Sequence, residues 1–166
     1  MAFLIWCILA GTVGSHADST VVEQFLNTDF TIIGSVDSFP RSISTSLAMA
    51  NPGGRYNATD VVDDARLPFR RLLFGGRSDS LWFIYYEQGG IGYSRNLVIF
   101  RYKGLTVLTL WAGWAQFDPV ANISDLKTAI GRSVIIDVHD HNKKALGKYT
   151  IVVMPANEFN HRLFRK

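Results

Sequence analysis

The sequence predicts an α+β fold in which about six or seven strands form an antiparallel β-meander and about two or three short helices pack on it. Four apolar, aromatic-rich runs follow one another in the middle of the chain, at residues 69–74, 81–87, 96–102 and 105–111. Short glycine-containing links at 75–79, 89–92 and 103–104 join them, which is typical of hairpins rather than crossovers. Signals for short helices lie on both sides of this region.

The elements before the meander follow from local patterns. Thr20 and Glu23 form a capping box ahead of apolar residues, which predicts a helix over 20–27. Residues 30–36 have the composition of a strand, which the Ser-Phe-Pro sequence at 38–40 ends. Residues 42–50 fit either a helix or an irregular strand, and Asn-Pro-Gly-Gly at 51–54 breaks the chain.

Local patterns also predict the elements in and after the meander. Residues 81–86 are apolar on both alternating faces, as in a central strand that is covered on both sides. An Asn or Ser cap, an early Asp and Gly131 predict a helix over 122–130. Residues 133–138 and 149–154 then predict two more strands, joined by a polar loop that we expect to form a hairpin.

The N-terminal residues predict export. Residues 1–10 are unbroken apolar sequence, and Ser15 and Ala17 form the small-x-small pattern that a signal peptidase accepts. The division is therefore a signal peptide at 1–17 and a single globular domain at 18–166, with no stable membrane span after cleavage. No Lys or Arg precedes the apolar run, so a buried N-terminal strand or helix is the alternative.

Cysteine content favours a particular compartment. The only cysteine, Cys7, lies inside the predicted signal peptide, so the mature chain is expected to be cysteine-free and without disulfides. A cysteine-free exported domain fits a bacterial periplasm best and the extracellular space second. Two N-glycosylation sequons, at Asn57 and Asn122, favour a eukaryotic secretory route instead.

The charge balance does not predict a nucleic-acid partner. The chain has 17 Lys and Arg against 14 Asp and Glu, a formal net charge of +3. Nucleic-acid binders concentrate basic residues in a stripe, whereas here they form small separate groups.

The first candidate site is the segment 85–95, Tyr-Tyr-Glu-Gln-Gly-Gly-Ile-Gly-Tyr-Ser-Arg. Tyr86, Glu87, Tyr93 and Arg95 surround three glycines that permit unusual backbone angles and close approach of a partner. Tyr and Arg are enriched where proteins bind one another. The alternative is a β-hairpin that needs glycine for its turn, with Glu87 and Arg95 as a cross-strand ion pair.

The second candidate site is a possible metal centre at 137–141. Asp137, His139 and His141 would project from one face of a strand, and their side chains are ligands that zinc accepts. The alternative is a solvated strand end, because the run continues into Asn-Lys-Lys. A third feature, the aromatic run 111–117, fits either a stacking platform or core packing.

These observations lead to one hypothesis and two alternatives. The leading hypothesis is a small extracytoplasmic binding protein without cofactor or catalysis, whose partner is a protein or an envelope component. An inhibitor or immunity-type protein acting on an envelope-directed enzyme fits this description. The alternatives are a metal-dependent hydrolase that uses Asp137, His139 and His141, and a structural module of an envelope assembly.

Overall fold

The computed structural model describes residues 16–79, 81–103, 106–115, 120–137 and 150–154. An eight-stranded sheet forms the middle of the molecule, in the order β1-β3-β4-β5-β6-β8-β7, and β2 pairs beside β1 on β3. The strands are β1 (Thr31–Ile33), β2 (Met49–Ala50), β3 (Arg70–Arg77), β4 (Leu81–Gln88), β5 (Ser94–Lys103), β6 (Thr106–Ala115), β7 (Val134–Asp137) and β8 (Thr150–Met154). The helices are α1 (His16–Asn27), α2 (Arg41–Leu47) and α3 (Ile123–Gly131), with a 3₁₀ turn at Val36–Ser38.

The predicted α+β class and meander are confirmed. Strands β3, β4, β5 and β6 are consecutive in sequence and pair antiparallel with their neighbours. The apolar run predicted as a central strand is β4, which lies between β3 and β5 and is covered on both faces.

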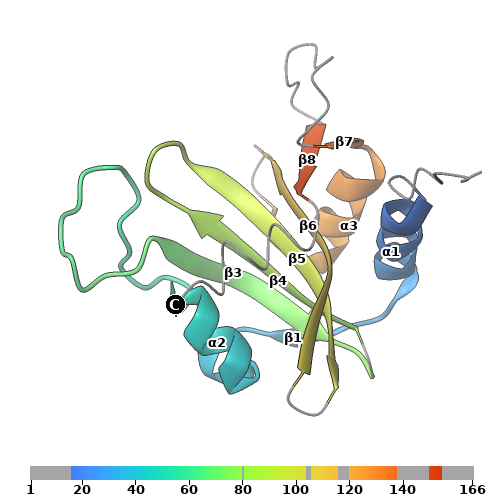
Figure 1. Cartoon of the computed structure of the whole chain (residues 1–166), viewed down its shortest axis with the longest axis horizontal. Coiled ribbons are helices and arrows are strands. Elements are labelled where there is room, and N and C mark those ends of the chain that lie inside the picture. The colour runs from blue at the N-terminus through green and yellow to red at the C-terminus, as the bar shows by residue number, and fades with distance from the viewer. Residues whose placement is uncertain (1–15, 80, 104–105, 116–119, 138–149, 155–166) are drawn as a thin grey trace, which may run out of the picture.

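Two cores lie on opposite faces of this sheet. Successive residues of a strand point to opposite faces, and β4 sends Phe83 and Tyr85 into one core and Ile84 and Tyr86 into the other. Helices α1 and α3 cover the first core, whereas α2 and the 3₁₀ turn cover the second. Figure 1 shows α1 and α3 side by side, and α2 apart from them.

The helices refine the expectations. Helix α1 begins at His16, before the predicted start, so Thr20 lies inside the helix and is not its cap. Residues 42–50 contain both predicted alternatives, because they include most of α2 and also the short strand β2 that follows it. Helix α3 is confirmed: the Asn122 side chain caps it by accepting a hydrogen bond of 3.0 Å from the Asp125 backbone N–H.

Two glycines predicted as a link belong to strand β3 instead. Gly75 and Gly76 pair with Ile84 and Phe83 of β4. A Cβ atom at Gly75 would collide with the ring of Phe39, and one at Gly76 with the ring of Phe83. Glycine is therefore required here because aromatic rings pack directly on the backbone, which the sequence pattern alone does not distinguish from a turn.

The predicted hairpin between the last two strands is wrong. Strands β7 and β8 are neighbours, but they pair parallel, with Val134 opposite Thr150 and Asp137 opposite Val153. A tight hairpin cannot join parallel strands, so the parallel register rules out the expected hairpin. Of these two strands, only β8 pairs with the meander, antiparallel to β6, and β7 is an edge strand of the described sheet.

The predicted signal peptide lies almost wholly outside the described residues. Its last residues, His16 and Ala17, are the first residues of α1. Among the helices of the described ranges, none combines the length and apolar character needed to cross a bilayer.

Candidate functional site

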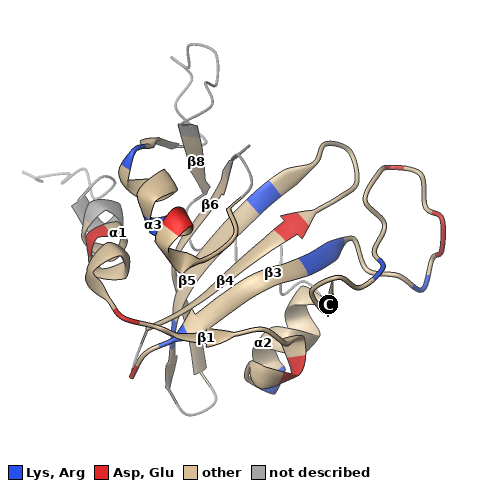
Figure 2. Ribbon diagram, turned by 180° about the vertical axis from the view of Figure 1, so that it is seen from behind, with Lys and Arg blue, Asp and Glu red and all other residues tan. Residues whose placement is uncertain are grey.

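A row of alternating charge crosses three strands at one end of the sheet. The strand register places Arg71 of β3 opposite Glu87 of β4, and Glu87 opposite Arg95 of β5. Figure 2 shows this basic, acidic, basic order on β3, β4 and β5. We call these three residues the polar row. It lies at the end of the strands where the β4–β5 turn and the 51–69 loop meet.

Glu87 is the centre of the polar row. Its side chain is only 5% exposed, and its carboxylate forms an ion pair with the Arg71 guanidinium. The Tyr93 hydroxyl donates a hydrogen bond of 2.8 Å to the other carboxylate oxygen. Arg71 also lies over the ring of Tyr56, with its guanidinium carbon 4.5 Å from the ring centroid. The buried carboxylate is therefore compensated by a cation and a hydroxyl, as burial of a charge requires.

Tyr93 connects Glu87 to Arg95. Its hydroxyl accepts a hydrogen bond of 3.1 Å from Arg95 Nε while it donates to Glu87. Partial burial raises the pKa of Tyr93, and the hydrogen bond from Arg95 opposes this rise. The predicted Glu87–Arg95 neighbours are thus in register, but the Glu87 carboxylate pairs with Arg71 and a tyrosine hydroxyl lies between the carboxylate and Arg95.

Tyr86, a predicted binding residue, is buried. It is 1% exposed and belongs to the core under α2, on the face of β4 opposite to Glu87. Burial raises the pKa of its hydroxyl to about 12, with the Arg70 charge opposing. Because its side chain is inaccessible, Tyr86 supports the sheet and not a binding surface. The remaining three predicted residues, Glu87, Tyr93 and Arg95, are brought together.

The three glycines of the β4–β5 turn have local explanations. Gly90 and Gly92 have φ angles of 100° and 99°, in the left-handed region that favours glycine. A Cβ atom at Gly89 would collide with the backbone of Asn57 and Ala58, so the turn lies directly against the 51–69 loop. The close approach that the glycines permit is thus made by this chain itself.

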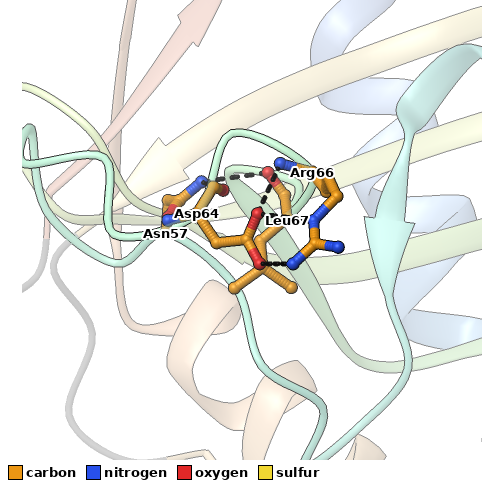
Figure 3. A network of polar contacts seen from close by, with 4 residues as sticks. All are labelled: Asn57, Asp64, Arg66 and Leu67. Atoms are coloured by element: carbon orange, nitrogen blue, oxygen red, sulfur yellow. Dashed lines mark hydrogen bonds and ion pairs between the residues drawn. The ribbon is translucent and has the colours of Figure 1, made fainter.

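The 51–69 loop is a part of the site that the sequence analysis missed. The loop contains no helix or strand, and irregular segments longer than about 15 residues are uncommon in compact domains and usually functional or disordered. Here the loop is anchored. The buried Asn57 side chain donates hydrogen bonds of 2.9 Å and 3.0 Å to the carbonyl oxygens of Asp64 and Leu67, as Figure 3 shows.

Further contacts complete this anchor. Arg66 binds both carboxylate oxygens of Asp64, at 3.0 Å and 2.9 Å, and lowers the pKa of that carboxyl group. The Gly89 N–H donates a 2.8 Å hydrogen bond to the Phe69 carbonyl oxygen, which ties the loop to the β4–β5 turn. The sequence marks Asn57 only as a sequon, but in the folded chain this residue is 1% exposed and its side-chain amide forms hydrogen bonds.

The exposed apolar side chains at this end are the second feature that sequence reasoning missed. Ile91, at the tip of the β4–β5 turn, is 98% exposed. Further large apolar side chains with at least two fifths of their surface exposed are Val61, Val62, Phe69 and Tyr93. Figure 1 shows that the loop and the turn project from the same end of the sheet. An apolar residue inside a turn or an irregular loop was the signal available in the sequence.

The metal-site candidate receives no support from the described residues. Asp137 is the last residue of β7, whereas His139 and His141 lie outside the described part of the chain. Within the described part, no group of three His, Cys, Asp or Glu side chains is placed to hold a metal ion. Of the aromatic run, Trp111 is 1% exposed and packs in the core under α1 and α3.

Comparison of the chain with protein-family models, curated proteins and solved structures finds no match.

Proposed function

We propose that this chain is a non-enzymatic binding protein and that it binds a partner protein through the β4–β5 turn. The observation that carries the proposal is Ile91, which is 98% exposed on a turn held by the Gly89 N–H bond to the Phe69 carbonyl oxygen before it and by the Tyr93 hydroxyl bond to Glu87 after it. A Cβ atom at the neighbouring Gly90 would lie 3.9 Å from the Phe69 ring, and Tyr93, on the other side of Ile91 in the chain, bonds to Arg95. We call Ile91, Phe69, Tyr93 and Arg95 the turn surface. It combines apolar, aromatic and arginine side chains, the types that contribute most to protein interfaces.

The polar row supports this proposal as a scaffold. Tyr93 is 44% exposed, yet its hydroxyl is held by Arg95 and Glu87 at the same time. A tyrosine ring whose orientation is fixed before binding loses little conformational entropy when a partner covers it. The ion pair of Glu87 with Arg71 in turn fixes the carboxylate that holds the tyrosine. Arg71 and Glu87 of the row therefore position the turn surface, to which only the third member of the row, Arg95, belongs.

Export completes the proposal. The apolar residues 1–10 and the small residues Ser15 and Ala17 support secretion of the chain, with the periplasm as the first compartment and the extracellular space as the second. The partner is then a protein of the cell envelope or its surroundings, and an enzyme inhibited by this chain is one such partner. N-terminal sequencing of the exported chain tests this part. A first residue near Asp18 supports it, and an intact Met1 contradicts it.

The turn surface is tested by comparing capture of envelope proteins by immobilised wild type and two variants. Ile91→Asp places a charge on the turn surface. Leu108→Asp is the matched control, because Leu108 is 54% exposed near the other end of β6. We expect the control to retain a partner that Ile91→Asp loses by about tenfold or more. Identical captured proteins from all three chains, with both variants folded, would overturn the proposal.

A further inference from the structure

We propose that residues 58–63, here called the valine loop, insert into an apolar pocket of the partner protein whose rim carries Lys or Arg side chains. This inference rests on the proposed binding function and adds to it a second contact and the chemistry of the partner. The valine loop contains Val61 and Val62, which are 65% and 49% exposed.

The two valines have no role in either core. Neither belongs to the apolar clusters on the two faces of the sheet. All six residues of the valine loop are exposed. Adjacent β-branched apolar side chains at the outer end of a loop do not stabilise this fold, and exposed apolar surface of this kind is typical of interaction sites.

The valine loop is held in shape at its base. The Asn57 side chain donates to the Asp64 and Leu67 carbonyl oxygens, and its Oδ1 atom accepts a hydrogen bond of 3.4 Å from the Asp64 backbone N–H. The bonds between Asn57 and Asp64 join the two residues that flank the segment 58–63 (Figure 3). A loop that is ordered before binding avoids most of the entropy loss that a flexible loop suffers on insertion into a pocket.

Charge determines which pocket is complementary. Asp60 and Asp63 flank the two valines, and no hydrogen bond or ion pair joins either carboxylate to another side chain of the described ranges. The third carboxylate, Asp64, is neutralised by Arg66. The valine loop therefore presents an apolar centre between two negative charges. A pocket with a basic rim attracts it, whereas an anionic membrane surface repels it.

Small probes test this complementarity without a known partner. The side-chain methyl groups of the full chain are followed by NMR during titration with benzyltrimethylammonium, an apolar cation, and with benzoate, an apolar anion of similar size. We expect saturable shifts of the Val61 and Val62 methyl signals with the cation only. The Leu108 methyl signals, from an equally exposed site elsewhere, are expected to shift about threefold less with the same probe. Equal responses to both probes, or equal shifts at Leu108, would overturn the inference.

Two variants separate charge from shape. Asp60→Asn with Asp63→Asn leaves the valines in place, and we expect it to weaken cation binding by about threefold to tenfold. Val61→Ser with Val62→Ser keeps the charges, and we expect it to lose the saturable response. Unchanged cation binding by both variants, with the fold intact by circular dichroism, contradicts the proposal.

Two further measurements assign other occupants. Sedimentation of the wild-type chain that shows self-association abolished by the valine variant would identify a second copy as the occupant and overturn the inference. Binding to phosphatidylcholine vesicles that the same variant abolishes would identify a lipid surface and also overturn it. The probe titration needs no partner, so it can fail while the Ile91→Asp experiment succeeds, and the two proposals fail separately.

Discussion

Replacement of Glu87 by Gln removes the negative charge of the polar row while it preserves the shape of the side chain. In the native chain the carboxylate is 5% exposed, pairs with Arg71 and accepts a hydrogen bond from Tyr93. A charge-assisted hydrogen bond contributes about 1.5–3 kcal/mol. Breaking a fully buried ion pair costs about 3–5 kcal/mol. The Arg71 side chain is 30% exposed, so water compensates part of the loss.

We therefore expect Glu87→Gln to lower the free energy of unfolding by about 2 kcal/mol. In a domain of about 150 residues this corresponds to a decrease in Tm of roughly 4–8 °C. Urea denaturation at neutral pH measures the free energy of unfolding, and the same samples give Tm. Glu23→Gln is the matched control, because Glu23 lies exposed on α1, and we expect a change within about 0.5 kcal/mol.

A double-mutant cycle with Arg71→Met assigns the effect to the ion pair. If the pair is responsible, the double variant loses at least about 1 kcal/mol less than the sum of the two single variants. Additive losses would show that Arg71 and Glu87 act independently. A loss for Glu87→Gln as small as that of the Glu23 control would refute the view that this carboxylate holds the row together.

Three further predictions concern stability. Gly89→Ala is expected to destabilise the chain by about 1–3 kcal/mol because the added methyl group collides with the Asn57 and Ala58 backbone. Gly131→Ala, with open space around it in α3, is expected to stabilise the chain by up to about 1 kcal/mol. Denaturant unfolding compares the two variants, and equal effects would contradict the packing argument. Asn57→Ala removes the side-chain donor from the carbonyl oxygens of Asp64 and Leu67, of which the Asp64 oxygen still accepts from the Leu67 N–H, and it is expected to cost about 1–3 kcal/mol, with faster amide exchange and proteolysis confined to 58–66 if the anchor is local. Burial raises the pKa of Tyr86 to about 12 in the folded chain, so the unfolded chain loses this proton first as the pH rises. The contribution of Tyr86 to the free energy of unfolding is therefore fully present below about pH 10 and is lost as the pH rises toward 12. Tyr86→Phe is expected to remove about 2–3 kcal/mol of this alkaline loss, and an unchanged pH dependence of unfolding would count against it.

Local patterns in the sequence were sufficient for most of the fold. The strands of the meander were predicted because alternation of apolar residues, interrupted by glycine-containing turns, depends only on neighbours in the chain. Helix α3 was predicted for the same reason, since its cap, Asn122, bonds to Asp125 three residues later. The pairing of Glu87 with Arg95 across β4 and β5 also follows from a short hairpin, and the structure has this register.

Contacts between distant segments could not be predicted in this way. The β3 glycines, Gly75 and Gly76, resemble a turn until Phe39 and Phe83 are packed against them. The parallel pairing of β7 with β8 depends on which edge of the sheet is open after β6, and not on the composition of either strand. Tyr86 has the side chain of a binding residue, but the face of β4 on which it lies is decided by the core under α2.

At the end of the sheet that carries the β4–β5 turn, residue order alone places tyrosine, arginine and glutamate around a glycine-rich turn. Folding sets the environment of each of these side chains. It buries Tyr86, pairs Glu87 with Arg71 from another strand, and leaves Ile91 exposed. The physical reason is that burial and ion pairing depend on residues brought together by sheet register and by the anchored 51–69 loop, whereas the type and order of residues depend on the chain alone.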